Sequence, residues 1–115
     1  MWLFMNDSFL SVVADTKHPN NLLVRARMHG DIEAVVPNAK VTIDMTCDYP
    51  CRASINRHIF AIRMSERIAD IEYDSFKDTC ADPHRHNAYM SVWSVMINEF
   101  QKVCSKYKWP VKEVK

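Results

Sequence analysis

Thiol and imidazole side chains gather in residues 80–93, which read CADPHRHNAYMSVW. Thiolates and imidazoles are the ligands that zinc prefers, and a thiol next to an imidazole can act as a nucleophile. Two further thiols lie in the segment CDYPC, so the candidate chemical groups are Cys47, Cys51, Cys80, His84 and His86. Two site hypotheses follow, a metal centre and a thiol-based catalytic centre.

The spacing of these residues favours neither hypothesis. The patterns C-x3-C and C-x3-H-x-H differ from the paired short knuckles of structural zinc sites. A catalytic pair of Cys80 and His86 would need hydrogen-bond reach, and the chain has no oxyanion motif beside it. We therefore assign no catalytic residue, metal or cofactor, and interpret the cysteines as small buried side chains. A thiol- or metal-dependent enzyme is the third-ranked function.

Composition narrows the function classes further. The chain has 115 residues, a formal net charge of +1 and a single glycine. One glycine is too few for a glycine-rich phosphate loop, and the near-zero charge gives no overall attraction to nucleic acid. No apolar run reaches the roughly 20 residues that a membrane span needs. Without a recognisable leader, we expect a cytoplasmic protein with reduced thiols and no membrane association.

Two strand pairs are predicted from period-two alternation of apolar and polar residues. Residues 9–15 and 22–28 flank the turn segment TKHPNN and predict a first β-hairpin. Residues 39–46 and 51–56 flank CDYP and predict a second hairpin. In these strands we expect the following side chains to face the core: Val24, Ala26, Met28, Val41, Ile43, Met45, Cys51, Ala53 and Ile55.

Helices are predicted between and after the hairpins. Residues 30–37 form one short helix that Pro37 ends, and Asn56 is a plausible N-cap for a helix over residues 57–71. A short helical turn follows. The longest helix begins at His86 or Asn87, with Pro83 and His84 still in the loop, and runs to Tyr107. Its apolar residues are spaced by three and four: Tyr89, Val92, Trp93, Met96, Phe100, Val103 and Tyr107.

These elements define an α+β fold in the order strand, strand, helix, strand, strand, helix, helix. We expect a two-layer sandwich in which a four-stranded antiparallel sheet, made of two β-hairpins, carries the helices on one face. Residues 1–108 form a single domain, and residues 109–115 form a flexible basic tail.

Several segments together resemble a family of short bacterial proteins of unknown function. The matching segments are MWLFMNDSFLSVVAD, LLVRAR followed by GDIE, DYPCRA, IADIEYDSFKD and RHNAYMSVWSVM, within residues 1–97. The two cysteines of CDYPC depart from the aromatic-rich strand entry of that family. The resemblance implies relatedness and brings no activity with it.

The polar side of the strands is the best candidate for binding. If alternate residues face the core, Arg25, Arg27 and Arg52 share the outer face, with Asp44 nearby. Guanidinium groups recognise carboxylate and phosphate groups through several planar donors. A solvated sheet face with weak ion pairs is the plain alternative. Charges also alternate in blocks, and Arg63 and Arg67 belong to a basic block on the helix over residues 57–71.

We therefore predict a non-enzymatic binding protein whose polar sheet face and charged helix surface engage a macromolecule, most simply a protein. By analogy of size and composition alone, an inhibitor of a bacterial defence complex, such as an anti-CRISPR protein, fits this description. The alternative is a nucleic-acid-binding protein that uses the same arginines and the lysine-rich tail, although the strands offer no evident stacking aromatics. A homodimer formed through a free edge strand is a further expectation. The predicted binding residues are Arg25, Arg27, Asp44, Arg52, Arg63 and Arg67.

Overall fold

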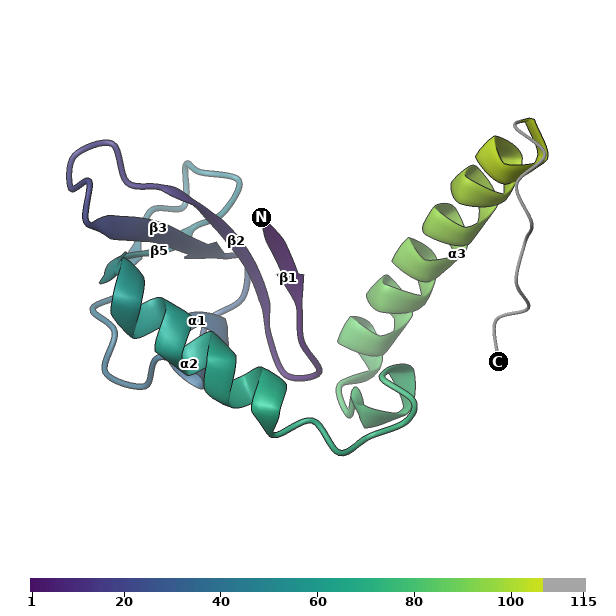
Figure 1. Cartoon of the computed structure of the whole chain (residues 1–115). Helices are drawn as coiled ribbons and strands as arrows, with labels where there is room; N and C mark the ends of the chain where they lie inside the picture. Colours follow the sequence, from purple (N-terminus) through teal and green to yellow (C-terminus); the bar gives the residue numbers. More distant parts are fainter. Residues whose placement is uncertain (107–115) are drawn as a thin grey trace. The chain divides into compact units, whose positions relative to one another are not determined.

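A five-stranded antiparallel sheet is the centre of the computed structural model, which describes residues 1–106. The spatial order is β1-β2-β3-β5-β4 (Figure 1). The α+β class and both hairpins are confirmed, because β2 pairs with β3 and β4 pairs with β5. The expectation of four strands is wrong. The strands are β1 (Trp2–Phe4), β2 (Phe9–Ala14), β3 (Asn21–Ala26), β4 (Thr42–Ile43) and β5 (Cys51–Asn56).

The additional strand, β1, pairs with β2 in the register Leu3 to Leu10. Directly opposed residues of antiparallel strands point to the same face, so Leu3 packs beside the fully buried Leu10. The terminal ammonium group of Met1 donates to the carbonyl of Val12 over 2.7 Å, which extends this contact by a further residue. A three-residue strand shows almost no alternation, which is why the sequence pattern alone did not reveal it.

One face of the sheet forms the core. Val12, Val24 and Ala53 face one another across β2, β3 and β5, and Ala26 lies opposite Cys51. All five side chains are buried. Two helices, α1 (Asp31–Val35) and α2 (Arg57–Ala69), lie on this face (Figure 1) and add Ile32, Val35 and Phe60 to the core. The two-layer arrangement is therefore present in residues 1–79.

The short helix α1 is anchored at its start. Gly30 has a φ of +93°, a conformation that favours glycine, and allows the chain to turn from β3 into α1. Asp31 is almost fully buried, and its carboxylate accepts a hydrogen bond of 3.0 Å from the backbone N–H of Phe9. That bond joins α1 to the start of β2.

Two predicted strands are shorter than expected, and three of their apolar residues are exposed. β3 ends at Ala26, so Met28 lies outside the sheet and does not face the core. β4 contains only Thr42 and Ile43. It ends there because Asp44 begins a tight turn, accepting a hydrogen bond of 3.0 Å from the N–H of Thr46. Met45 lies beyond β4 and is exposed, which corrects the expectation that it faces the core. Ile43 pairs with the core residue Cys51 and so lies on the core side, but at this edge strand it is 47% exposed.

The last helix, α3 (Pro83–Lys106), begins earlier than predicted. The Asp82 carboxylate accepts a 3.0 Å hydrogen bond from the N–H of His84, as an N-cap does, and Pro83 takes the first helical position. His84 and Pro83 are therefore helical and not part of the loop. A single 3₁₀ turn, η1 (Lys77–Thr79), precedes this segment.

Contacts divide the chain into two compact units, residues 1–79 and a second unit that starts at Cys80. The predicted tail, residues 109–115, lies outside the described residues, as does the final part of the domain predicted for residues 1–108. None of the helices in residues 1–106 has the length and apolar character needed to cross a membrane.

Candidate functional site

The outer face of the sheet, opposite the helices, carries one continuous row of side chains. Trp2 pairs with Ser11, Ser11 with Arg25, Arg25 with Arg52, and Arg52 with Thr42. Directly opposed residues share a face, so this row crosses all five strands. Two of the predicted arginines are thus immediate neighbours on the central strands.

Tyr49 contacts all three of the arginines predicted on the sheet. Its ring lies 4.8 Å from the guanidinium carbon of Arg25 and 4.7 Å from that of Arg27. Arg52 donates to the carbonyl oxygen of Tyr49 at 3.5 Å. A cation above an aromatic face is stabilised by about 0.5–2 kcal/mol, which offsets repulsion between the two guanidinium groups. The structure therefore brings Arg25, Arg27 and Arg52 together around one residue.

The turn between β4 and β5 places Tyr49 over the sheet. The N–H of Asp44 bonds to the carbonyl of Pro50 over 2.9 Å, which closes the turn. The carboxylate of Asp48 accepts a bond of 2.9 Å from the N–H of Tyr49. Tyr49 is only 6% exposed, although it belongs to a turn.

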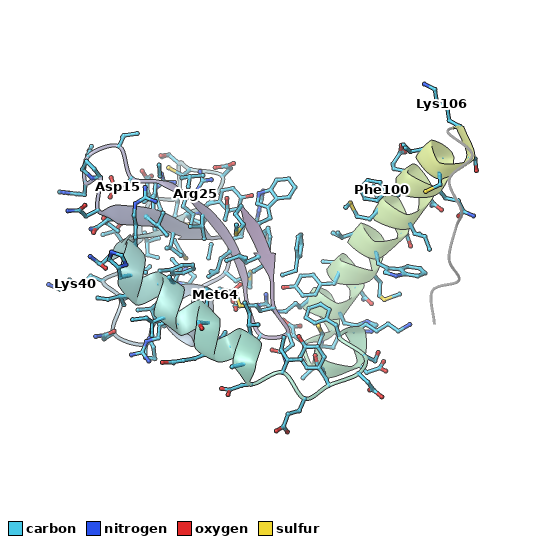
Figure 2. All side chains as sticks on the ribbon, in the orientation of Figure 1. Asp15, Arg25, Lys40, Met64, Phe100 and Lys106 are labelled. Atoms are coloured by element: carbon cyan, nitrogen blue, oxygen red, sulfur yellow. The ribbon has the colours of Figure 1, made fainter. Side chains whose placement is uncertain are left out.

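An aromatic cluster continues the face toward β1. The rings of Phe4 and Phe9 stack with centroids 4.7 Å apart, and Phe9 lies 6.5 Å from Tyr49. Trp2 is 66% exposed. We call the set Trp2, Phe4, Phe9, Arg25, Arg27, Tyr49 and Arg52 the aromatic–arginine face. Figure 2 shows Arg25 on the side of the strands away from the helices.

The three arginines differ in how firmly they are held. Arg25 is half-buried and donates from Nη2 to the buried hydroxyl of Ser11 over 2.7 Å. Its Nε is buried and has no hydrogen-bond partner among the described residues. Arg27 lies just beyond the end of β3 and is exposed. Within residues 1–106 none of the three forms an ion pair, and of the three only Arg52 has the charge of a nearby carboxylate, that of Asp44, acting on it.

Asp44 lies near this face but uses its carboxylate within the turn. It accepts from the hydroxyl and the N–H of Thr46 and from the thiol of Cys47. The Thr46 hydroxyl bond is the main reason why the pKa of Asp44 lies below its usual value, and the charge of Arg52 contributes less. Asp44 therefore shapes the turn that carries Tyr49 and is electrostatically close to Arg52.

The other two predicted residues lie on the helix layer. Arg63 is exposed and makes an ion pair of 3.4 Å with Glu66, one turn further along α2. Arg67 forms a bidentate pair with Asp7, with both distances 2.7 Å, and also donates to the carbonyl of Ala34 at 3.0 Å. It fastens α2 to the β1–β2 turn and to α1. The structure does not bring Arg63 and Arg67 together with the arginines of the sheet.

A hollow of about 530 Å³ lies beside this Arg67–Asp7 pair. It opens between the β1–β2 turn and the end of α2, and apolar side chains such as Met5, Met64 and Ile68 line much of it. Because Arg67 is bonded to Asp7 and Ala34, its guanidinium is largely committed, which leaves Asn6 and Asp70 as further polar residues of the lining.

The cysteines and histidines do not form a metal-binding cluster in the described part of the chain. Among residues 1–106, no three His, Cys, Asp or Glu side chains are close enough to hold a metal ion together. Cys47 bonds to Asp44, whereas Cys51 lies in the core of the sheet. Burial raises the pKa of the thiols of Cys51 and Cys80, which keeps both protonated and weakly nucleophilic at neutral pH.

Sequence reasoning missed the four aromatic residues of the face, Trp2, Phe4, Phe9 and Tyr49. Phe4 could have been recognised only by detecting strand β1, because the pairing of β1 with β2 puts Phe4 on the outer face. For Tyr49 the contacts with Arg25 and Arg27 span more than twenty residues of sequence, which no local pattern encodes.

Comparisons with protein-family models, with curated proteins and with solved structures yield no match to this chain. The resemblance to short bacterial proteins of unknown function accordingly adds no activity, and the functional argument depends on the geometry of the face.

Proposed function

We propose that this chain is a non-enzymatic binding protein whose aromatic–arginine face docks onto an acidic surface of a protein partner. The observation that carries the proposal is the grouping of Arg25, Arg27 and Arg52 around Tyr49 without ion-pair partners among residues 1–106. Such a group of cations is available for carboxylates supplied from outside.

The residue types support a protein interface. Tyrosine, tryptophan and arginine are the side chains most enriched among those that dominate binding energy. Arg25 and Arg27 stack on a ring, and Arg25 also bonds to Ser11, so part of their conformational freedom is already lost before binding. Preorganisation of this kind lowers the entropic cost of association.

The mode of action would be occlusion. A protein that covers an acidic or nucleic-acid-like surface on its partner needs contact area and charge complementarity but no reactive group. An inhibitor of a bacterial defence complex, such as an anti-CRISPR protein, is one role that such a face suits.

A photo-crosslinker tests where the partner contacts the chain. We place benzoylphenylalanine at position 2 or at position 62, because Trp2 and Ile62 are similarly exposed, at 66% and 57%. Trp2 lies on the aromatic–arginine face and Ile62 on α2. In a bacterial host lysate, we expect a discrete crosslinked protein from position 2 and none from position 62. The same product from position 62 alone would overturn the proposal.

A specific observation also favours the second candidate, single-stranded nucleic acid. Trp2 and Phe4 are exposed on the same face as the arginines, which supplies the stacking groups that the strands had not been expected to carry. Fluorescence polarisation with a labelled oligothymidine measures this function. Binding that weakens steeply with added salt supports it, and its absence at low salt excludes it.

A further inference from the structure

A second, separate surface lies on α3. Five of its apolar residues, Tyr89, Trp93, Met96, Phe100 and Val103, follow one another at spacings of four, three, four and three. This is a repeat of 3.5 residues, which keeps a narrow apolar seam facing a second helix as the two wind around each other.

Four of the five seam residues are open to solvent, whereas Tyr89, at the start of the seam, is buried and only 9% exposed. Trp93, Met96 and Phe100 are each about half exposed, and Val103 is more than one-third exposed. Residues 80–106 contain no second helix or strand on which α3 could pack within its own unit. Isolated helices gain most of their stability from packing an amphipathic face, so an uncovered seam of this length favours association.

We propose that α3 pairs along this seam with α3 of a second copy of the chain. A seam with the 3.5-residue repeat matches another copy of itself, since each side chain fits between those of an identical helix. Binding to the seam on α3 does not require a charged partner. Residues 89–98 contain no charged side chain, and Glu99 is already paired with Lys102 over 3.1 Å. Two copies therefore meet without like-charge repulsion at the centre of the seam.

The available area fits a weak dimer. Large aromatic side chains bury about 150–250 Å² when fully covered, so half-exposed residues offer on the order of 100 Å² each. Trp93, Met96 and Phe100 offer about this much each, and Val92 and Val103, which are under two-fifths exposed, offer less, so two copies bury just under roughly 1,000 Å² in total, the range of a weak, transient interface. We therefore expect a micromolar dimer and not an obligate one.

Sedimentation equilibrium of the full chain tests this pairing. Over about 5 µM to about 500 µM, the mass should rise from that of one chain toward that of two. The variant Met96→Glu/Phe100→Glu places two carboxylates in the seam and should remain a monomer throughout. The matched control, Ser91→Glu/Asn98→Glu, adds the same charge to exposed positions on the opposite side of α3 and should dimerise as the unaltered chain does.

Two results would overturn the proposal. One is an unaltered chain that stays monomeric over the whole range. The other is a seam variant that still dimerises, which would place the interface elsewhere, for example at the edge strands β1 or β4. Because a double variant can lose its fold, the unaltered chain is also mixed with a nitrogen-15-labelled copy carrying benzoylphenylalanine at position 93. Crosslinked peptides that combine labelled residue 93 with an unlabelled seam residue are expected, and their absence contradicts the pairing.

Discussion

The ring of Tyr49 accounts for most of what is unusual about the outer sheet face. With two guanidinium groups stacked on it and a third bonded to its carbonyl, it fixes three cations in a small area. The alternation in residues 22–28 and 51–56 correctly predicted that Arg25 and Arg52 share a face. The same pattern could not reveal their common contact, because a ring from a turn is positioned by tertiary packing.

Arg67 was also predicted to bind a partner, but unlike the arginines of the sheet it forms an ion pair within the fold. Its guanidinium is bonded to Asp7 and to the carbonyl of Ala34, so its contacts stabilise the fold. We expect Arg67→Met to lower the free energy of unfolding by about 1–2 kcal/mol at neutral pH, since the pair is bidentate but partly exposed. Urea denaturation measures this loss.

The pH dependence of this loss of stability shows whether the ion pair between Arg67 and Asp7 causes it. The hydrogen bond from Arg67 is the main reason why the pKa of Asp7 lies below its usual value of 3.8. A carboxyl group whose pKa is lower in the folded state stabilises the fold fully above the unfolded pKa and loses this effect as the pH falls through the folded pKa. The difference between the unaltered chain and Arg67→Met should therefore shrink below about pH 4. An unchanged difference would show that only packing and the Ala34 bond matter.

At the scale of elements, helix α2 was the most predictable part of the chain. Asn56 was expected to cap it, and its carboxamide oxygen accepts from the N–H groups of His58 and Ile59 at 2.9 and 3.2 Å. Local capping chemistry needs no tertiary information, which explains this success. In contrast, β1 and β4 are edge strands of three and two residues whose extent depends on their neighbours.

The cap gives a direct prediction for this element. Asn56→Ala removes both acceptor bonds and should cost about 1 kcal/mol of stability, whereas Asn56→Asp keeps an acceptor and should cost much less. Thermal unfolding followed by circular dichroism measures both variants. Equal losses in the two would mean that the acceptor oxygen at position 56 does not stabilise the helix as a cap.

At the scale of the whole molecule, the α+β class followed from the alternation of strand and helix periods, and the structure agrees. The residues of the candidate binding site could not be predicted from these periods. The cysteines and histidines that first suggested a site form no metal-binding cluster within residues 1–106, whereas the aromatic–arginine face combines residues from β1, β2, β3, β5 and a turn. Its assembly is a property of the sheet, so only strand pairing reveals it.

The two candidate surfaces belong to different compact units of the chain. The aromatic–arginine face belongs to residues 1–79, and the seam on α3 belongs to the unit that begins at Cys80. Variants in one unit can therefore be combined with assays of the other. A seam variant that abolishes self-association should leave the crosslink from position 2 unchanged unless the partner requires two copies.

If the arginines around Tyr49 bind an acidic partner, the affinity of the crosslinked partner should distinguish two charge-matched variants. Arg27→Glu/Arg52→Glu alters the face, and Lys40→Glu/Arg63→Glu makes the same charge change at exposed positions outside it. Isothermal titration should show at least about a tenfold weaker binding for the first variant and little change for the second. Equal affinities of the two variants, with both correctly folded, would contradict binding through these arginines.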